Sequence, residues 1–215
     1  MTRCHSLLLD FGGVISRTLF ECRAEIELHF GLPGGSLTWR GPLDPASDQL
    51  WRATLTGEIS DRDYWRQRTA ALGEFVGRTI EMSDVIYAVC AADPNRVIRP
   101  EALAMVRKAK ASGLRVGVLS NDLELLYGRE TVSRLGILHE VDAVVDGSWS
   151  RIHKPSPEAY LRALAALGSR AEHTVFLDDQ PRNVRGATAA GLFAVSFDIC
   201  DAAGSFDNVD RVLGL

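Results

Sequence analysis

Two short apolar runs that each end abruptly in carboxylates constrain the fold of this chain more than any other feature of its sequence. Residues 7–9 run directly into Asp10, and residues 174–177 run into Asp178 and Asp179. An apolar run of this length, bounded by a turn signal, is typical of a strand buried on both faces of a parallel sheet. The acidic residues then stand at the carboxyl ends of buried strands, where open α/β sheets bind ligands.

The second half of the chain alternates between short apolar runs and amphipathic stretches. Strands are predicted at residues 115–119, 143–145, 174–177 and 193–197, and helices at residues 101–112, 123–135, 157–167 and 182–190. Such alternation favours a parallel sheet with right-handed crossovers and helices on both faces. We therefore expect an α/β fold, a Rossmann-like parallel sheet.

Helical periodicity without a strong strand signal separates the first strand from the rest. Helices are predicted at residues 19–30, 46–55, 61–72 and 79–92, with a glycine- and proline-rich loop between the first two. Ser60 followed by Asp63 resembles a capping box. We expect residues 16–93 to form an inserted helical domain and residues 1–15 and 94–215 to form the core.

Composition excludes several classes of function. The 215 residues carry a net charge of −4 without a basic block, which gives no reason to expect nucleic acid as a partner. No apolar run is long enough to cross a bilayer, and the first strand follows the start of the chain directly, so a cytoplasmic protein is expected. The four cysteines are scattered, against a zinc cluster or a disulfide framework. A monomer or a homodimer is expected.

Further polar residues follow or adjoin the predicted strands. Ser120 and Asn121 end the strand at residues 115–119, where a following helix N-terminus suits an anion; an ordinary N-cap is the alternative. Lys154 lies in a segment that Pro155 and Pro157 constrain, although most lysines are simply solvated.

Adjacent carboxylates at residues 178 and 179 are unfavourable unless a cation compensates them. Together with Asp10 they offer a small set of hard oxygen ligands, which suits Mg²⁺. A solvated turn is the alternative interpretation of the pair.

The ordered set Asp10, Ser120-Asn121, Lys154-Pro155 and Asp178-Asp179 resembles the four motifs of the haloacid dehalogenase superfamily, over nearly the whole chain. The helical insertion resembles that superfamily's first cap class. More narrowly, residues 57–60, 119–121 and 176–179 resemble bacterial phosphatases of glucose 1-phosphate and the phosphatase domain of some epoxide hydrolases.

The resemblance implies a Mg²⁺-dependent phosphatase of a small phosphorylated metabolite. Asp10 would attack phosphorus and form an aspartyl-phosphate. Asp179, Asp10 and the carbonyl of Gly12 would hold the metal, with Asp178 and Asn183 as ligands or supporting groups. Ser120 and Asn121 would bind phosphate oxygens, Asn121 through its backbone or amide, and Lys154 would neutralise charge.

Gly12 departs from the superfamily pattern, because most of its phosphatases carry an acid–base Asp at this position. Either the substrate has an easier leaving group, such as an anomeric or acyl phosphate, or another residue acts, with Asp178, Arg17, His153 and cap residues as candidates. A weakly active or non-catalytic phosphate-binding protein is the alternative. A 2-haloacid dehalogenase is disfavoured, because such enzymes lack the acidic pair.

The resemblance also implies that the cap sets specificity by closing over the site. Side chains suited to an anionic or sugar-like substrate are Arg17, Trp39, Arg40, Trp51, Arg52 and Trp65. Packing inside the cap is the competing interpretation for Trp51 and Trp65, and solvation for the arginines.

Overall fold

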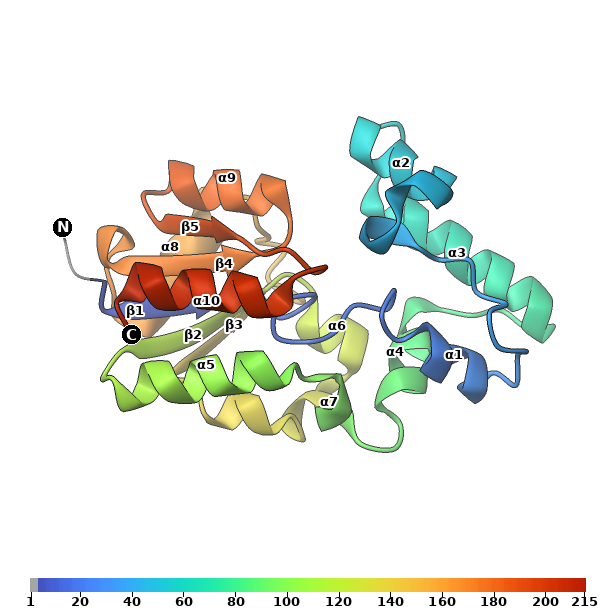
Figure 1. The fold of residues 1–215 in the computed structure, drawn as a ribbon, viewed down its shortest axis with the longest axis horizontal. Helices are drawn as coiled ribbons and strands as arrows, with labels where there is room; N and C mark the ends of the chain where they lie inside the picture. The colour runs from blue at the N-terminus through green and yellow to red at the C-terminus, as the bar shows by residue number, and fades with distance from the viewer. Residues whose placement is uncertain (1–3) are drawn as a thin grey trace. The chain divides into compact units, whose positions relative to one another are not determined.

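The computed structural model describes residues 4–215, which form two compact units (Figure 1). One unit, the core unit, contains the chain up to Arg17 and from Asn95 onwards; the other, the insert, is Thr18–Pro94. None of the helices among the described residues is long and apolar enough to span a membrane.

Five parallel strands form the sheet of the core unit, in the spatial order β3-β2-β1-β4-β5. The central strand β1 pairs on both sides, so Leu9 lies opposite Val118 of β2 and Leu177 of β4. This arrangement confirms the predicted α/β parallel sheet. The strands are β1 (Ser6–Leu9), β2 (Arg115–Ser120), β3 (Ala143–Asp146), β4 (Thr174–Asp178) and β5 (Phe193–Ser196).

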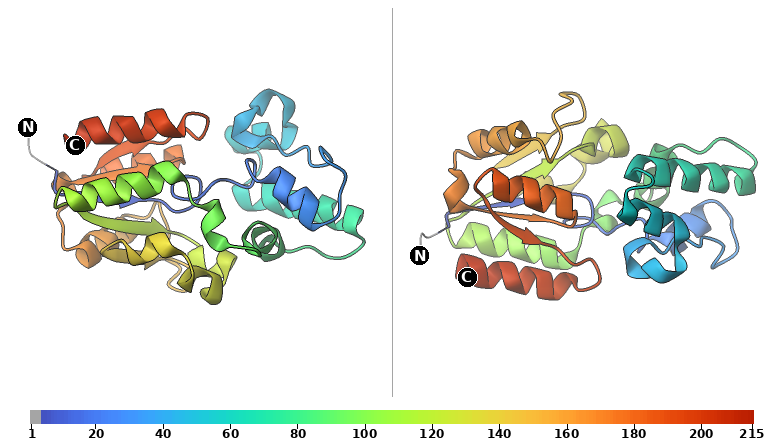
Figure 2. Two further views of the ribbon diagram at one scale, coloured as in Figure 1. Left: turned by 60° about the horizontal axis from the view of Figure 1, so that its bottom comes forward. Right: turned by 90° about the horizontal axis from the view of Figure 1, so that it is seen from above.

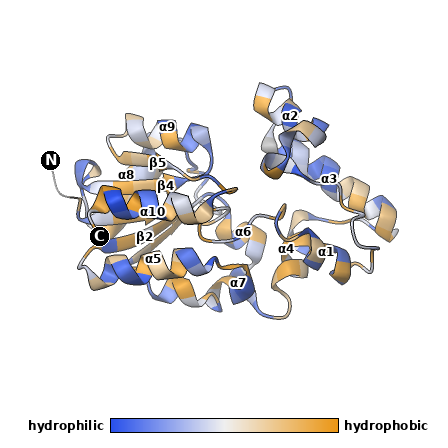
Figure 3. Cartoon of the chain, viewed as in Figure 1, coloured by the Kyte–Doolittle hydropathy of each residue, from blue (hydrophilic) through white to orange (hydrophobic). Residues whose placement is uncertain are grey.

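Helices cover both faces of this sheet (Figure 2). Leu7 and Leu9 of β1 pack in one apolar cluster with α5 (Pro100–Ala111) and α10 (Ala202–Leu213). Leu8 points to the opposite cluster, against α8 (Pro157–Leu167) and α9 (Pro181–Ala189). Figure 3 shows hydrophobic and hydrophilic residues alternating along α5 and α10, as expected for helices with one buried face. The continuous apolar run at residues 7–9 is thus explained by a strand buried on both sides.

Two parts of the core unit differ from the sequence prediction. The single helix predicted at residues 123–135 is two short helices, α6 (Leu123–Tyr127) and α7 (Arg129–Ser133), with Gly128 between them at φ +76°. Glycine adopts this left-handed backbone without the steric cost that other residues meet. Helix α10 was not predicted, although its buried residues Phe206, Val209 and Leu213 follow helical spacing.

The insert contains the helices α1 (Arg23–His29), α2 (Gln49–Thr56), α3 (Asp61–Val76) and α4 (Met82–Cys90). The capping box predicted from Ser60 and Asp63 is present at the start of α3. The first helix is shorter than the predicted 19–30, and within the glycine- and proline-rich loop a short 3₁₀ turn occupies Gly41–Leu43.

A buried carboxylate organises the interior of the insert. Asp48 is 1% exposed and accepts hydrogen bonds from the Tyr64 hydroxyl at 2.8 Å and from Arg68 at 2.5 Å. The N–H groups of Arg40, Gly41 and Trp51 also donate to it. Although burial favours the neutral acid, these hydrogen bonds lower the pKa of Asp48 to about 2. Asp48 therefore joins the loop before α2 to helix α3.

Candidate active site

Three charged side chains meet at the carboxyl ends of β1 and β4. The Lys154 ammonium lies 2.5 Å from Oδ1 of Asp10 and 2.7 Å from Oδ2 of Asp178. Asp10 follows β1, and its N–H donates to the Leu177 carbonyl of β4, which keeps it in the sheet plane. All three charged residues are buried.

A buried ammonium between two carboxylates stays charged. Although burial alone disfavours the ammonium, the charges of Asp10 and Asp178 hold the pKa of Lys154 above its ordinary value. Lys154 therefore supplies a fixed positive charge beside the Asp10 carboxylate.

Asp178 has partners on every side. Its Oδ1 accepts from the Gln180 N–H at 2.8 Å, and Nδ2 of Asn183 lies 3.0 Å from Oδ1 and 3.1 Å from Oδ2. Asn183 lies in the first turn of α9, two residues after Pro181. With the ion pair to Lys154, both oxygens of Asp178 therefore accept hydrogen bonds within the site.

Asp179 lies against the turn that follows β1. A Cβ atom built on Gly13 would be 2.7 Å from Oδ2 of Asp179, and Gly13 has φ +88°. Oδ1 of Asp179 is buried and has no hydrogen-bond partner among the described residues, and the same holds for Oδ1 of Asn183. A buried carboxylate oxygen without a donor is costly, and a cation would compensate it.

Asp10, Asp178 and Asp179 together fit a metal ion. Each offers a carboxylate oxygen, and these oxygens lie within 4.8 Å of one another. Burial raises the pKa of Asp10 to about 6, with Lys154 opposing the rise and Asp178 adding to it. Burial and the charges of Asp10 and Asp178 hold the pKa of Asp179 well above its ordinary value. Three clustered carboxylates with one lysine leave uncompensated negative charge, which suits a hard divalent cation.

Ser120 and Asn121 occupy different roles in the geometry. Ser120 is the buried last residue of β2, and its carbonyl accepts from the Gly147 N–H. The side-chain amide of Asn121 bonds to the backbone of Lys154, with Oδ1 accepting from the N–H at 2.8 Å and Nδ2 donating to the carbonyl at 3.1 Å. Asn121 thus joins the end of β2 to the Lys154 segment.

The start of α6 is not an open anion site. The N–H groups of Leu123 and Glu124 donate to the Asp146 carboxylate at 3.0 and 2.8 Å, and the Leu125 N–H donates to Ser148. The strand-terminal Asp146 of β3 therefore already binds these N–H groups, which are not free for a ligand. Helix α8 begins at Pro157 as predicted, and its N-cap residue Ser156 makes no side-chain capping bond.

The residues considered as replacements for an acid at position 12 have other contacts. Gly12 is exposed, and a Cβ there would meet nothing within 4 Å. His153 lies 3.2 Å from the Gly147 carbonyl and 3.9 Å from Asp122. Arg17 donates to the Arg96 carbonyl at 3.3 Å. Asp178 is held by Lys154 and Asn183 as described above.

Two residues that support the site were not identified from the sequence. Arg99, 5% exposed, donates from Nε to the Gly13 carbonyl at 3.1 Å and packs over the Phe197 ring. Gly13 provides the close approach to Asp179. The glycine pair after Asp10 signalled a turn, whereas nothing in the local sequence marks Arg99, which is distant in the chain.

The tryptophans and arginines of the insert that were candidates for specificity contact other residues of the insert. Trp51 and Trp65 pack around Phe20, with ring centroids 5.3 and 5.0 Å away. Trp39 is 3% exposed and contacts Trp65 edge-on. Trp39 is thus buried inside the insert, whereas Trp51 and Trp65 pack there and remain partly exposed. Arg52 donates to the Ala46 carbonyl, and the Arg40 backbone donates to Asp48.

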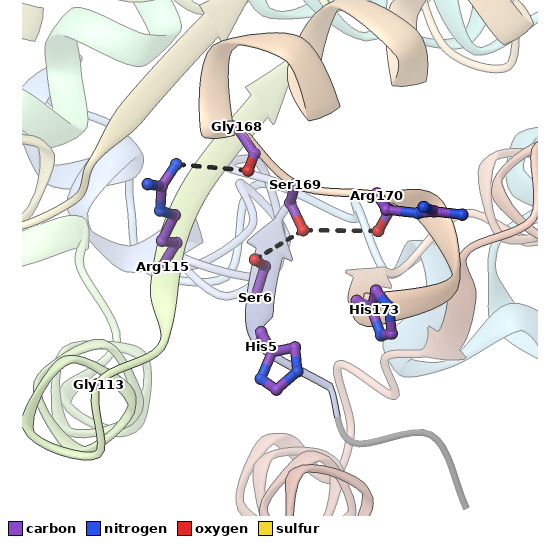
Figure 4. A pocket seen from close by; sticks show the side chains of 8 residues that line it. All are labelled: His5, Ser6, Gly113, Arg115, Gly168, Ser169, Arg170 and His173. Carbon is purple, nitrogen blue, oxygen red and sulfur yellow. Dashed lines mark hydrogen bonds between the residues drawn. The ribbon is translucent and has the colours of Figure 1, made fainter.

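A separate hollow of about 330 Å³ lies at the amino-terminal edge of the sheet (Figure 4). Its arginines serve neighbouring elements: Arg115 donates to the Leu167 carbonyl at the end of α8, and Arg170 pairs with Glu172. Ser6 and Arg115 begin their strands, so the hollow lies at the opposite end of the strands from the carboxylates. Its lining residues are His5, Ser6, Gly113, Arg115, Gly168, Ser169, Arg170 and His173.

Residues 7–191 match the family model of the haloacid dehalogenase-like hydrolases. The chain is 35% identical over 100 residues to a Mycobacterium tuberculosis phosphatase, covering 46% of each chain. It is 33% identical over 95 residues to the phosphoglycolate phosphatase of Rhodospirillum rubrum, covering 44% of this chain and 39% of the relative. The match thus spans less than half the length of these relatives.

The fold also resembles a solved structure of L-2-haloacid dehalogenase from Xanthobacter autotrophicus. The TM-score is 0.57 at 22% identity, and the match covers 90% of this chain and 77% of that chain. At this identity the likeness concerns the fold alone.

Proposed function

The chain belongs to the haloacid dehalogenase-like hydrolases, and from that premise we propose that it is a Mg²⁺-dependent phosphatase of a small phosphorylated metabolite. The observation that carries the proposal is the set of contacts around Lys154, whose ammonium binds both Asp10 and Asp178 while Asp179 lies beside them. The relatives named as phosphatases support the same activity. The insert is assigned the role of the specificity-setting cap, and the other unit that of the catalytic core.

Asp10 is the proposed nucleophile. Lys154 contacts Oδ1 at 2.5 Å and fixes the carboxylate. A carboxylate oxygen of Asp10 attacks the substrate phosphorus, the bond from phosphorus to the leaving oxygen breaks, and an aspartyl-phosphate forms. Water then hydrolyses this intermediate, releasing phosphate and restoring the carboxylate. Ser120, at the end of the neighbouring strand, is proposed to donate to a phosphate oxygen.

Asp10, Asp178, Asp179 and the Gly12 carbonyl are the proposed holders of Mg²⁺. The orphaned Oδ1 of Asp179 and the raised pKa of that carboxyl fit a cation at this place. When bound, Mg²⁺ supplies positive charge that offsets the carboxylates and the phosphoryl oxygens. Lys154 contributes the permanent part of that charge, and Asn183 holds Asp178 in place.

Gly12 determines which substrates suit this site. It has no side chain to protonate a leaving group, and the space beyond its backbone is open. A leaving group that departs without a proton needs no such acid. We therefore assign the substrate to small phosphates with easily displaced leaving groups, such as acyl or anomeric phosphates.

A panel assay tests this function. Purified protein is incubated with acyl, anomeric and simple alkyl phosphates, with Mg²⁺ or with chelator, and released phosphate is measured. We expect Mg²⁺-dependent release, fastest from the acyl and anomeric phosphates, that Asp10→Asn abolishes while the protein stays folded. Metal-independent halide release from a 2-haloacid would establish dehalogenation instead. No turnover in any condition, with phosphate still bound, would indicate a binding protein.

A further inference from the structure

The carboxamide of Asn121 pairs with the backbone of Lys154 on both sides. Its Oδ1 accepts from the Lys154 N–H at 2.8 Å, and its Nδ2 donates to the Lys154 carbonyl at 3.1 Å. One side chain therefore pairs with both the backbone N–H and the backbone carbonyl of Lys154, as a neighbouring strand would. Asn121 directly follows β2, so this pairing ties Lys154 to the sheet.

Lys154 needs such an anchor, because it lies in a turn between β3 and α8 and outside the strands. A lysine ammonium ends a flexible four-carbon side chain with several rotatable bonds. Its Nζ must nevertheless reach Asp10 at 2.5 Å and Asp178 at 2.7 Å. A shift of the Lys154 backbone would move the ammonium away from one or both carboxylates.

The next residue, Pro155, packs against helix α9. A Cβ on Gly186 of α9 would lie 2.7 Å from Cβ of Pro155 and 2.9 Å from its carbonyl oxygen. Helix α9 therefore packs directly against Pro155, and the same helix carries Asn183, which binds Asp178. The Lys154-Pro155 segment is thus fixed between Asn121 and α9.

We propose that Asn121 is a positioning residue, which acts on the reaction through Lys154 rather than by contacting the phosphate with its own amide. Its Oδ1 and one N–H of its Nδ2 are already bonded to the backbone of Lys154. This inference rests on the proposed phosphatase activity and gives Asn121 a role different from that of Ser120, the phosphate-binding neighbour.

A double-mutant cycle tests the proposal. Asn121→Ala, Lys154→Met and the double variant are compared for kcat, KM and inhibition by inorganic phosphate. We expect Asn121→Ala to lower kcat on the order of 10²-fold, the loss that follows a misplacement of about 1 Å. Because Lys154 also offsets charge on the phosphoryl oxygens, any weakening of phosphate inhibition should come through Lys154. In the Lys154→Met background, Asn121→Ala should cost no further activity, because the two residues act as one unit.

Ser120→Ala is the matched comparison, since Ser120 precedes Asn121 in the chain. Ser120→Ala should weaken phosphate inhibition, and this effect should persist in the Lys154→Met background. An Asn121→Ala effect on kcat or on phosphate inhibition that is equally large in both backgrounds would overturn the proposal.

Hydrogen exchange of the Lys154 amide gives a second measurement that needs no substrate. The metal-free wild type and Asn121→Asp, which keeps an acceptor for this N–H, should protect it, whereas Asn121→Ala should exchange faster. Equal protection in all three proteins would contradict the anchoring role. If the wild type hydrolyses no phosphate ester, the proposed function fails while this exchange comparison still decides the anchoring.

Discussion

The backbone of Gly13 lies directly against the carboxylate of Asp179, so that a Cβ on residue 13 would be 2.7 Å from Oδ2 and 3.0 Å from Cγ. Real Cβ atoms do not approach another atom so closely. The turn after β1 and the end of β4 are therefore fitted to each other, and the pair of glycines after Asp10 has two distinct roles. Gly13 permits the approach, whereas Gly12 faces open space.

Gly13→Ala should damage the site, while Gly12→Ala should leave the fold intact. At φ +88° an alanine costs about 1–2 kcal/mol, and its methyl group must also displace Asp179. We expect Gly13→Ala to lower the free energy of unfolding by at least that amount and to weaken Mg²⁺ binding. Denaturation and metal titration measure both. Equal Mg²⁺ affinity in the two variants would show that the position of Asp179 does not depend on this contact.

Gly12→Asp should raise phosphatase activity toward esters with poor leaving groups. The open space at position 12 accommodates a side chain, and a general acid–base typically contributes about 10²–10⁴-fold to the rate. The gain should be large for alkyl phosphates and small for acyl phosphates, because the carboxylate released from an acyl phosphate departs without a proton. Steady-state kinetics on the two substrate classes measure it.

Gly12→Asn is the control for that substitution, because it has the same shape without an ionisable group. It should reproduce none of the gain. Unchanged activity of Gly12→Asp on alkyl phosphates would mean that another residue already supplies the proton.

In the metal-free protein, ionisation of Asp10 should reduce stability as the pH rises through the range from about 4 to 6. The pKa of Asp10 is raised to about 6 from 3.8, mainly by burial, so the folded state binds a proton that the unfolded state releases earlier. Stability from the protonated carboxyl is full below the unfolded pKa and disappears above the folded one. Asp10→Asn cannot ionise, so its stability advantage over the wild type should widen across this range. Urea denaturation with chelator at pH 4.5 to 7.5 measures the difference.

Added Mg²⁺ should act in the opposite direction. Metal ligands must be deprotonated, so stabilisation by Mg²⁺ should be larger at pH 7.5 than at pH 5. Asp179→Asn should remove most of it. A Mg²⁺ effect that is the same at both pH values would argue against a carboxylate site.

Strands buried on both faces and strand-terminal acids made the core unit predictable from the sequence. The register that places Leu9 beside Leu177 also places Asp10 beside Asp178, so a local pattern was sufficient. The break at Gly128 was missed because the apolar periodicity continues through the glycine. Helix α10 was missed although its apolar residues follow helical spacing.

Long-range contacts account for the parts of the site that sequence reasoning did not find. The sequence separates Asn121 from Lys154 by 33 residues, and only the parallel crossover through β3 brings the amide to that backbone. The carboxylate of Asp146 binds the start of α6 in a similar way, and no local motif encodes that contact. Motifs thus identified which residues gather, whereas the partners of each side chain depended on the tertiary fold.

Asp48→Asn should destabilise the insert at neutral pH and much less in acid. The amide would place N–H groups against donors that now bind a carboxylate, and Arg68 would lose its counter-charge, which costs roughly 1–3 kcal/mol. The pKa of Asp48 is lowered to about 2, so its contribution to stability is present above the unfolded pKa of 3.8 and is lost as the pH falls toward 2.

Three of the four tryptophans, Trp39, Trp51 and Trp65, lie in the insert, so fluorescence during urea denaturation at pH 7 and pH 3 reports on this unit. The exposed Asp44→Asn is the control and should change stability by less than about 0.5 kcal/mol. An Asp48→Asn effect of equal size at both pH values would show that packing, rather than the charge of the buried carboxylate, holds the loop to α3.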